Sequence, residues 1–357
     1  MKNNIIRFYL YIYIMLKITN INLKVLNNDT ELGNSRMEFK LSSANMDYVI
    51  INTIRRTIMS DIPIYAFGDF AFEKNTSIFH NNYLKLRLKH MPVWAIENDI
   101  EYLDTSKQTN KPSNEMDNIM EANEDADDVQ LEAEKNLNSS TLKQLTMYVN
   151  TKNKSNEIIT VTTNNVKFYY NQIQIPTPYK FQIPIIKLQP GQEIAFSAIS
   201  KIGTEQEDTM YSAVSICTYK QVNPNEFDFI IESRGQINEK RIIQVALINI
   251  EKKLRNFLKL FDEKKSDNNF KIDNNSITGE IIVNNEDHTL GNLISRGMQQ
   301  HNKIEFAGYN LPHPLIKKVN FHYKLMNDSN IRDIINDVVE YYSDIFAQIK
   351  KLIDDKL

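Results

Sequence analysis

The sequence has a single cysteine, Cys217, among 357 residues. One thiol cannot form a disulfide framework or a zinc site built from several thiolates, so we expect a protein of a reducing compartment. The sequence also lacks a glycine-rich phosphate loop, a nucleophile elbow, an HExxH motif and an EF-hand calcium loop. No stretch of it is typical of a catalytic centre, and we expect no enzymatic activity from the chain by itself.

Metal-ligating patterns are missing as well. His288, beside Glu286 and Asp287, is the best candidate for a site, but a cap of the following helix is its favoured role. The acidic run Glu124–Asp128 lacks the glycine turn and bidentate glutamate of a calcium loop, which favours a solvated charge run. We expect no metal and no cofactor, because the histidines lie scattered without ligand spacing, at His80, His90, His288, His301, His313 and His322.

Apolar runs long enough to cross a membrane are also absent. An apolar run at 8–16 follows Lys2 and Arg7, but it is too short for a bilayer, and no small-residue cleavage site comes after it. Residues 1–16 are therefore better explained as a dispensable extension, or by a true start at Met15 in place of Met1, than as a targeting signal. We expect a cytosolic or nuclear protein without a membrane partner.

The charge is unevenly distributed. The net charge is −3, and the segment Glu101–Asn136 holds eleven acidic residues against three lysines. The rest of the chain therefore carries 39 of the 42 basic and 34 of the 45 acidic residues, which makes it only mildly basic. This balance argues against a protein that coats nucleic acid. Residues 101–140 are rich in Asp, Glu, Asn and Ser, which predicts a disordered or weakly helical loop.

The first part of the chain alternates short strands and helices. Ser42–Asn45 offers N-cap residues for a helix with Ile50, Ile54 and Ile58 on one face, which ends before Pro63. A second short helix is predicted over Asn81–Lys89. Strands are predicted in this first part at 17–26, 37–41 and 65–73. The later predicted strands form a mostly β insert, at 145–150, 158–162, 167–170, 183–188, 193–202 and 213–219.

Two long helices follow, each with apolar residues at heptad-like spacing. Two such seams in one chain can pack against each other, although each could instead pack on its own sheet. The first seam is Ile243, Leu247, Ile250, Leu254, Phe257 and Phe261, and the second is Ile331, Ile335, Val338, Tyr342, Ile345, Ile349 and Leu352.

A faint internal repeat favours the first arrangement. Asn52-Thr53-Ile54-Arg55-Arg56 and Asn292-Leu293-Ile294-Ser295-Arg296 place Asn, Ile and Arg at matched offsets. Each repeat reads as a strand, a short helix, a strand and eventually a long helix. The sequence therefore predicts two copies of one α+β unit, joined by the polar linker Asp262–Asn269, which is a dimer written as one polypeptide.

Several ordered motifs carry a family resemblance. They resemble the signature of the third-largest subunit of eukaryotic RNA polymerase II and of its archaeal and bacterial α-type relatives. The motifs are Asn52–Pro63 (NTIRRTIMSDIP), Glu73–Ser77 (EKNTS), Leu84–Pro92 (LKLRLKHMP), Pro184–Ala198 (PIIKLQPGQEIAFSA) and Phe229–Gly235 (FIIESRG).

The last quarter of the chain resembles the eleventh subunit, which is the small α-type partner. The motifs there are Asn285–Leu293 (NEDHTLGNL) and Phe306–Leu315 (FAGYNLPHPL). Both partners in one chain resemble the fused α-like subunit of the RNA polymerases encoded by large nucleocytoplasmic DNA viruses. The resemblance spans roughly Lys17–Leu352 apart from the acidic loop.

The resemblance implies an α+β fold with two α-like dimerisation units, each a sheet plus long helices, fused as a pseudo-heterodimer. A mostly β insert domain interrupts the first unit. The implied ranges are 1–16 for an extension, 17–66 with 221–261 for the third-subunit-like domain, 67–220 for the insert with the acidic loop 101–140, 262–269 for the linker, and 270–357 for the eleventh-subunit-like domain.

The implied function is a non-catalytic assembly platform of a DNA-dependent RNA polymerase. The implied partners are the largest and second-largest subunits and small accessory subunits, with no sequence-specific DNA contact and no homo-oligomer. The implied location is the viral factory in the host cytoplasm, with the virion as a second location and the nucleus left open. The alternative is a stand-alone regulatory or nucleic-acid-binding module that uses the same fold.

The resemblance also assigns roles to residues. The large-subunit interface would be Asn52, Arg55, Arg56 and Arg87, and the dimerisation core would be the two seams from Ile243 to Phe257 and from Ile331 to Ile349. The family motif would be Glu286, Asp287, His288, Thr289, Leu290, Gly291, Asn292, Phe306, Gly308, Tyr309, Pro312, His313 and Pro314.

The sequence departs from its cellular relatives at two places. Many third subunits carry a cysteine-rich metal loop after the segment that matches Leu88–Pro92, and here the acidic loop without cysteine stands there. The segment Lys201–Asp208 also lacks the glycine- and histidine-rich character of the family. The contacts of that loop in cellular enzymes are therefore not implied for this chain.

Overall fold

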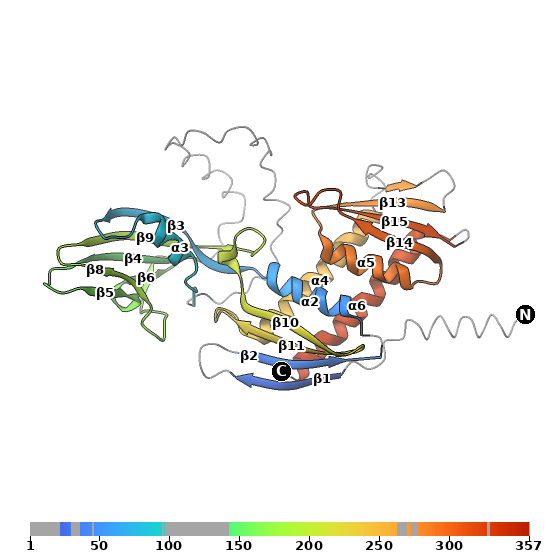
Figure 1. Ribbon diagram of the computed structural model, residues 1–357, viewed down its shortest axis with the longest axis horizontal. Helices are drawn as coiled ribbons and strands as arrows, with labels where there is room; N and C mark the ends of the chain where they lie inside the picture. The colour runs from blue at the N-terminus through green and yellow to red at the C-terminus, as the bar shows by residue number, and fades with distance from the viewer. Residues whose placement is uncertain are drawn as a thin grey trace, which may run out of the picture. The chain divides into compact units, whose positions relative to one another are not determined.

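The computed structural model describes residues 22–29, 36–44, 46–94, 96, 143–262, 270–272, 277–326 and 329–356. The predicted N-terminal extension, the acidic loop and most of the predicted linker lie outside these residues. The chain divides into two compact units, one formed by the residues up to Pro63 and from Thr204 onward, the other by Ile64–Gly203. Figure 1 shows the elements of both.

The first sheet of the larger unit is antiparallel, in the order β1(Asn22–Asp29), β2(Arg36–Ser42), β11(Glu226–Ser233), β10(Val214–Asn223). Side chains alternate along β2 and β11, so that every second residue is buried. Phe39 and Phe229 lie opposite each other in the register and stack with ring centroids 5.3 Å apart. One face of this sheet therefore packs into a hydrophobic core.

The second sheet repeats this order. It runs β12(Phe270–Ile272), β13(Thr278–Asn284), β15(Lys318–Leu325), β14(Ile304–Asn310), again antiparallel throughout. In both sheets the second strand precedes a short helix, and the third strand precedes a long one. The predicted internal repeat is therefore confirmed at the level of topology, and the fold class is α+β as the sequence indicated.

Four helices lie between the two sheets of this unit (Figure 1). They are α2(Tyr48–Ser60), α4(Glu239–Asp262), α5(His288–Gln300) and α6(Ile331–Lys356). Helix α2 contacts β10, and α5 contacts β14 and β15, so each short helix covers the sheet of its own half. Across the halves, α2 contacts α5 and α4 contacts α6. The predicted packing of the two long helices against each other is therefore present.

Both short helices are capped by aspartate, which corrects the sequence analysis. The cap of α2 is Asp47 and not a residue of Ser42–Asn45, because the Asp47 carboxylate accepts a hydrogen bond from the Val49 backbone N–H. The cap of α5 is Asp287, whereas His288 is the first helical residue. An aspartate in extended conformation satisfies one of the N–H groups that a helix start leaves unpaired.

The smaller unit is mostly β, as the sequence predicts for the insert. A five-stranded sheet has the order β3-β9-β4-β6-β7, and β5 pairs with β8. Helix α3(Asn81–Lys89) packs on β3 through Leu84 and Leu88, which are both buried. The strands are β3(Ile64–Asn75), β4(Leu145–Lys152), β5(Ile159–Thr162), β6(Lys167–Tyr170), β7(Ile173–Ile175), β8(Pro184–Leu188) and β9(Glu193–Gly203).

The boundaries of the two units differ from the predicted 66/67 and 220/221. The chain enters the smaller unit after Pro63 and leaves it after Gly203. The second boundary lies earlier because β10, which the sequence analysis assigned to the insert, forms a long antiparallel pair with β11 in the first sheet. A strand pattern alone does not say which sheet the strand joins.

Candidate subunit interface

The contact between α4 and α6 is built from apolar side chains that are almost fully buried. All eleven seam residues assigned to the dimerisation core expose 7% or less of their surface. The buried stripe is wider than the predicted seam, because Ile242, Val245 and Ala246 on α4 are also buried. On α6 the additional buried residues are Ile334, Val339, Phe346 and Ile353.

The wide buried stripe indicates that α4 and α6 each face a globular core on more than one side. A two-stranded coiled coil needs only the a and d positions, whereas a helix covered by a sheet and by other helices buries adjacent residues too. The sequence held a signal for this, because apolar residues come in adjacent pairs at Ile242-Ile243, Ile334-Ile335 and Val338-Val339.

Helix α5 approaches α6 closely at a glycine. A Cβ atom at Gly297 would lie 2.5 Å from Cγ1 of Val338 and 2.8 Å from Cε2 of Tyr342, distances that real Cβ atoms do not show. Both contacted side chains are buried and on α6. Gly297 is therefore required by the packing and not by the backbone conformation of the helix.

The contact between α2 and α5 carries charged side chains at both of its ends. Nη2 of Arg56 lies 3.0 Å from Oδ2 of Asp287, and its Nε donates to Oγ1 of Thr289 at 2.8 Å. At the other end, Nε of Arg296 lies 2.7 Å from Oδ2 of Asp47. Each arginine therefore reaches the aspartate that caps the opposite helix.

Arg56 has a partner within the chain. The resemblance implied that Arg55 and Arg56 both lie at the large-subunit interface, and the structure adds that Arg56 forms an ion pair with Asp287 while 38% of its side chain stays exposed. Sequence reasoning missed this pair because its partner, Asp287, is 231 residues away. The repeat held the signal, since Asp47 and Asp287 stand at the same offset from Asn52 and Asn292.

Arg55 lies beside Arg56 but makes only neutral contacts. Its Nε donates to Oδ1 of Asn52 at 3.0 Å, and its Nη1 lies 3.0 Å from Sδ of Met59. Among the described residues, no carboxylate forms an ion pair with it. Asn52 therefore positions Arg55 on α2 as a half-buried residue whose charge no described carboxylate neutralises.

A second charged cluster joins α4 to the ends of both short helices. Nζ of Lys253 lies 2.7 Å from Oδ2 of Asp61 and 3.8 Å from Oε2 of Glu286. Asp61 also accepts a hydrogen bond from Nε2 of Gln206 at 2.5 Å. Oε2 of Glu286 is buried and has no hydrogen-bond partner among the described residues. Lys253 therefore bridges a carboxylate of each half.

Burial and charge shift the pKa values in this cluster. Burial raises the pKa of Glu286 to about 7, although the attraction of Lys253 opposes the shift. Burial would lower the pKa of Lys253, but the carboxylates of Glu286 and Asp61 outweigh it and raise that pKa. Burial also opposes ionisation of Asp287, yet hydrogen bonds from Thr289 and the nearby cations leave its pKa lowered.

The shift at Glu286 predicts a pH dependence of stability. Because the pKa is about 7 in the folded chain and 4.5 ordinarily, the folded state binds this proton more tightly. The resulting stabilisation is complete below pH 4.5 and is lost as the pH rises through 7. Relative to Glu286→Gln, the wild-type chain should lose about 1 to 3 kcal/mol over this range. Urea unfolding at several pH values measures the difference, and parallel profiles would contradict it.

The family-motif residues of the C-terminal half occupy three places. Glu286 and the cap Asp287 directly precede α5, His288 to Asn292 form its start, and Phe306, Gly308 and Tyr309 lie on β14. Pro312, His313 and Pro314 stand in an exposed loop after β14. Nδ1 of His288 lies 3.2 Å from the Tyr309 hydroxyl oxygen, so the motif holds the start of α5 against β14. Its residues come together structurally and not as a catalytic constellation.

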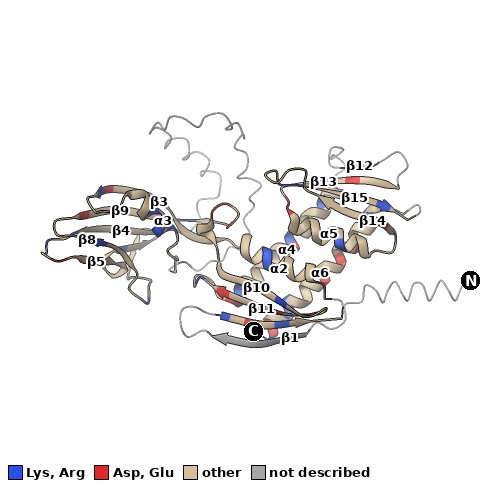
Figure 2. Ribbon diagram, viewed as in Figure 1, with Lys and Arg blue, Asp and Glu red and all other residues tan. Residues whose placement is uncertain are grey.

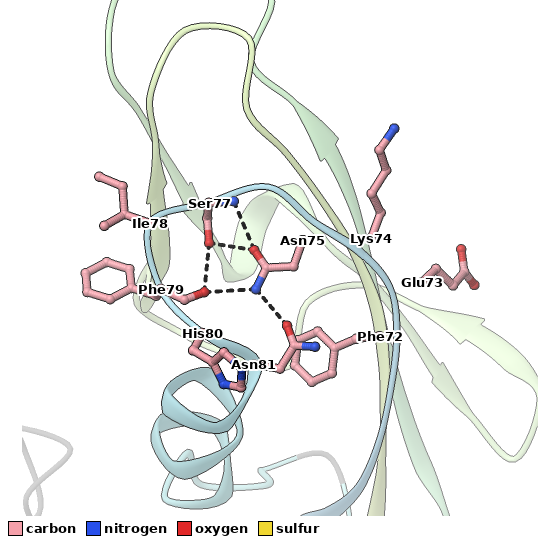
Figure 3. A pocket seen from close by; sticks show the side chains of 9 residues that line it. All are labelled: Phe72, Glu73, Lys74, Asn75, Ser77, Ile78, Phe79, His80 and Asn81. Atoms are coloured by element: carbon pink, nitrogen blue, oxygen red, sulfur yellow. Dashed lines mark hydrogen bonds between the residues drawn. The ribbon is translucent and has the colours of Figure 1, made fainter. Parts of the chain in front are cut away.

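The smaller unit presents a candidate surface around α3. The exposed apolar residues there are Ile78, Phe79, Tyr83 and Leu86, and the rings of Phe79 and Tyr83 stack. A pocket of about 450 Å³ lies at the turn from β3 into α3. In Figure 3 the side chain of Asn75 accepts a hydrogen bond from the Ser77 hydroxyl and donates one to the Phe79 carbonyl within the turn. The side chains of Ile78 and Phe79 point away from Asn75.

Arg87 belongs to this surface but is engaged within the unit. Its Nη2 donates to the backbone carbonyl of Pro184 at 2.8 Å.

Across the part of the chain that is described, no cluster of three or more His, Cys, Asp or Glu side chains could hold a metal ion. No described helix is both long and apolar enough to cross a membrane.

Two sheets of identical strand order that pair through their helices define a fused dimer of α-like units. The model of the RNA polymerase Rpb3/Rpb11 dimerisation domain matches residues 278–352, which run from the start of β13 through most of α6. The chain is 32% identical to the Rpo11 subunit of the RNA polymerase of Sulfolobus acidocaldarius, over 86% of that protein and 20% of this chain. The chain therefore belongs to the Rpb3/Rpb11 family of DNA-directed RNA polymerase subunits.

Two longer matches bear on the rest of the chain. An RNA polymerase subunit of Acanthamoeba polyphaga mimivirus is 27% identical over 94% of both chains. The rpac1 subunit of RNA polymerases I and III of Dictyostelium discoideum is 26% identical over 53% of this chain and 50% of its own length. The resemblance to a fused viral α-like subunit is therefore confirmed, and the chain is a subunit of the non-catalytic type.

Proposed function

We propose that the chain is the assembly platform of a viral multisubunit RNA polymerase, on which the largest and second-largest subunits and small accessory subunits gather. The observation that carries the proposal is the buried contact of α4 with α6, because it joins the two halves through residues of the chain itself. The fusion adds to this. A linker of the length of Asp262–Asn269 spans at most about 27 Å, which keeps the effective concentration of the second half in the mM range.

The location follows from the same proposal. A subunit of a viral transcription machinery works where the viral genome is transcribed, and we place it in the viral factory of the host cytoplasm, with packaging in the virion as part of the proposal. The mimivirus relative, which aligns over almost its full length, supports a viral setting.

Arg55 is the residue that we assign to the large-subunit contact, with the second-largest subunit as its partner. The guanidinium of Arg55 contacts only neutral groups among the described residues, so it can still pair with a carboxylate or carbonyl of a partner subunit. Assembly would bury this pair. The exposed apolar residues around α3 are a second contact area, since an apolar patch of this kind is typical of a protein interface.

Arg55→Ala should weaken recruitment of the second-largest subunit by about thirtyfold or more, because removing one partner of a buried charge pair costs about 2 kcal/mol or more. The measurement is co-purification of the two large subunits with the tagged chain, followed by titration. Arg255→Ala is the matched control, because Arg255 is exposed on α4 and its one ion pair among the described residues is with Glu251, one turn away. Full recruitment by folded Arg55→Ala would reject this contact, and failure of the wild-type chain to bind either large subunit would reject the platform itself.

A further inference from the structure

The caps of the two short helices have a double use. In α2, Oδ1 of Asp47 accepts from the backbone N–H of Val49 while Oδ2 binds Arg296. In α5, Oδ1 of Asp287 accepts from the backbone N–H of Thr289 while Oδ2 binds Arg56. One oxygen of each carboxylate therefore fixes its own helix start, and the other holds the opposite helix.

The two ion pairs also fix the direction of the helices. In each helix the arginine follows the capping aspartate by roughly 13 Å along the axis. Since each aspartate meets the arginine of the other helix, α2 and α5 run antiparallel. A parallel pairing in the same register would place aspartate against aspartate and arginine against arginine, and a shift by one turn, about 5.4 Å, would break both pairs.

We propose that Asp47, Arg56, Asp287 and Arg296 form a reciprocal clamp that selects the orientation and register in which the two halves pair. The apolar contact of α4 with α6 supplies most of the association, but burial of apolar area is non-directional. Charged groups at an interface exclude wrong arrangements, because like charges brought together are costly. The proposal concerns the chain's own halves, so it does not depend on any large subunit.

The four residues are accessible enough for this role to be tested by substitution. The side chains of Arg56 and Asp287 expose 38% and 34% of their surface, and those of Arg296 and Asp47 expose 41% and 16%. Their replacement leaves the apolar core intact. Figure 2 marks the basic and acidic residues along these helices.

The experiment measures the urea midpoint of the full chain by the helical signal in circular dichroism. Arg56→Glu puts a carboxylate against Asp287 and should lower the midpoint by about 0.5 M or more. Asp287→Asn retains a capping oxygen but removes the charge, so it should lower the midpoint of the wild-type chain. In the Arg56→Glu background the same change removes a repulsion and should raise the midpoint.

The matched control exchanges the aspartates. Asp47→Asn should raise the midpoint of Arg296→Glu but not that of Arg56→Glu. Asp287→Asn should raise the midpoint of Arg56→Glu but not that of Arg296→Glu. If Asp287→Asn lowers the midpoint equally in both backgrounds, the clamp does not exist. If Asp47→Asn rescues Arg56→Glu instead, the two helices pair in another register and the proposal is wrong.

A second measurement serves in case a charge-reversal variant does not fold. Raising the salt from about 0.05 M to about 1 M screens partly exposed ion pairs. The midpoint of the wild-type chain should then fall relative to that of Arg56→Gln with Arg296→Gln, which has lost both pairs but keeps polar side chains. An equal response of the two chains to salt would contradict the clamp.

Discussion

Replacing Leu254 and Ile345 together by aspartate is expected to separate the two halves of the chain. Leu254 on α4 is completely buried, and Ile345 on α6 exposes 3% of its surface. Each change removes an apolar side chain that contributes about 1.5 to 3 kcal/mol and leaves a carboxylate without a partner in the core. The sum exceeds about 5 kcal/mol, which is comparable to the whole stability of many domains.

The separation is measured after the chain has been cut within 263–269. The cut wild-type chain should elute as one species in size exclusion, and the cut double variant as two. Asn256→Asp with Gln348→Asp is the matched control, because both residues are exposed on the same two helices. A cut double variant that still elutes as one species would show that α4 and α6 do not hold the halves together.

Gly297→Val is expected to cost about 3 kcal/mol or more of unfolding free energy, and Gly297→Ala less. The Cβ alone would meet Val338 and Tyr342 at distances below 3 Å. Neither neighbour can move away freely, because both are buried between α5 and the core. Overpacking of this kind outweighs the gain of up to about 1 kcal/mol in helix propensity that alanine brings over glycine.

A rescue variant makes this prediction specific. Val338→Ala creates space at the contact, so it should destabilise the wild-type chain but restore stability in the Gly297→Ala background. Urea unfolding of the four chains measures both effects. If Gly297→Ala raises the midpoint, helix propensity dominates and the close approach of α5 to α6 is not required.

Much of the architecture could be predicted from local patterns. The heptad-like spacing indicated α4 and α6, and the position of Pro63 marked the end of α2. The long-range pairings could not be predicted in this way. The short strand β7 follows two residues with positive φ, Asn171 and Gln172, which no apolar pattern reveals.

The candidate interface shows the same division. The seams were visible because apolar periodicity is a local property, and all of their assigned residues are buried. Arg55 and Arg56 could not be told apart, since adjacent residues on a helix point only about 100° from each other and both lie off the apolar stripe. Their partners decide between them, and the partner of Arg56 stands in the other half of the chain.

The way in which the smaller unit joins the chain affects how the larger one folds. Ile64 and Gly203 are opposite each other in the β3–β9 ladder, so the unit begins and ends at one residue pair. Closing a long loop costs entropy that grows with the logarithm of its length. Once β3 and β9 have paired, that cost has already been met by the contacts of the smaller unit. Strands β2 and β11 pair across this insertion. The entropy cost of bringing them together is then that of closing a short connection.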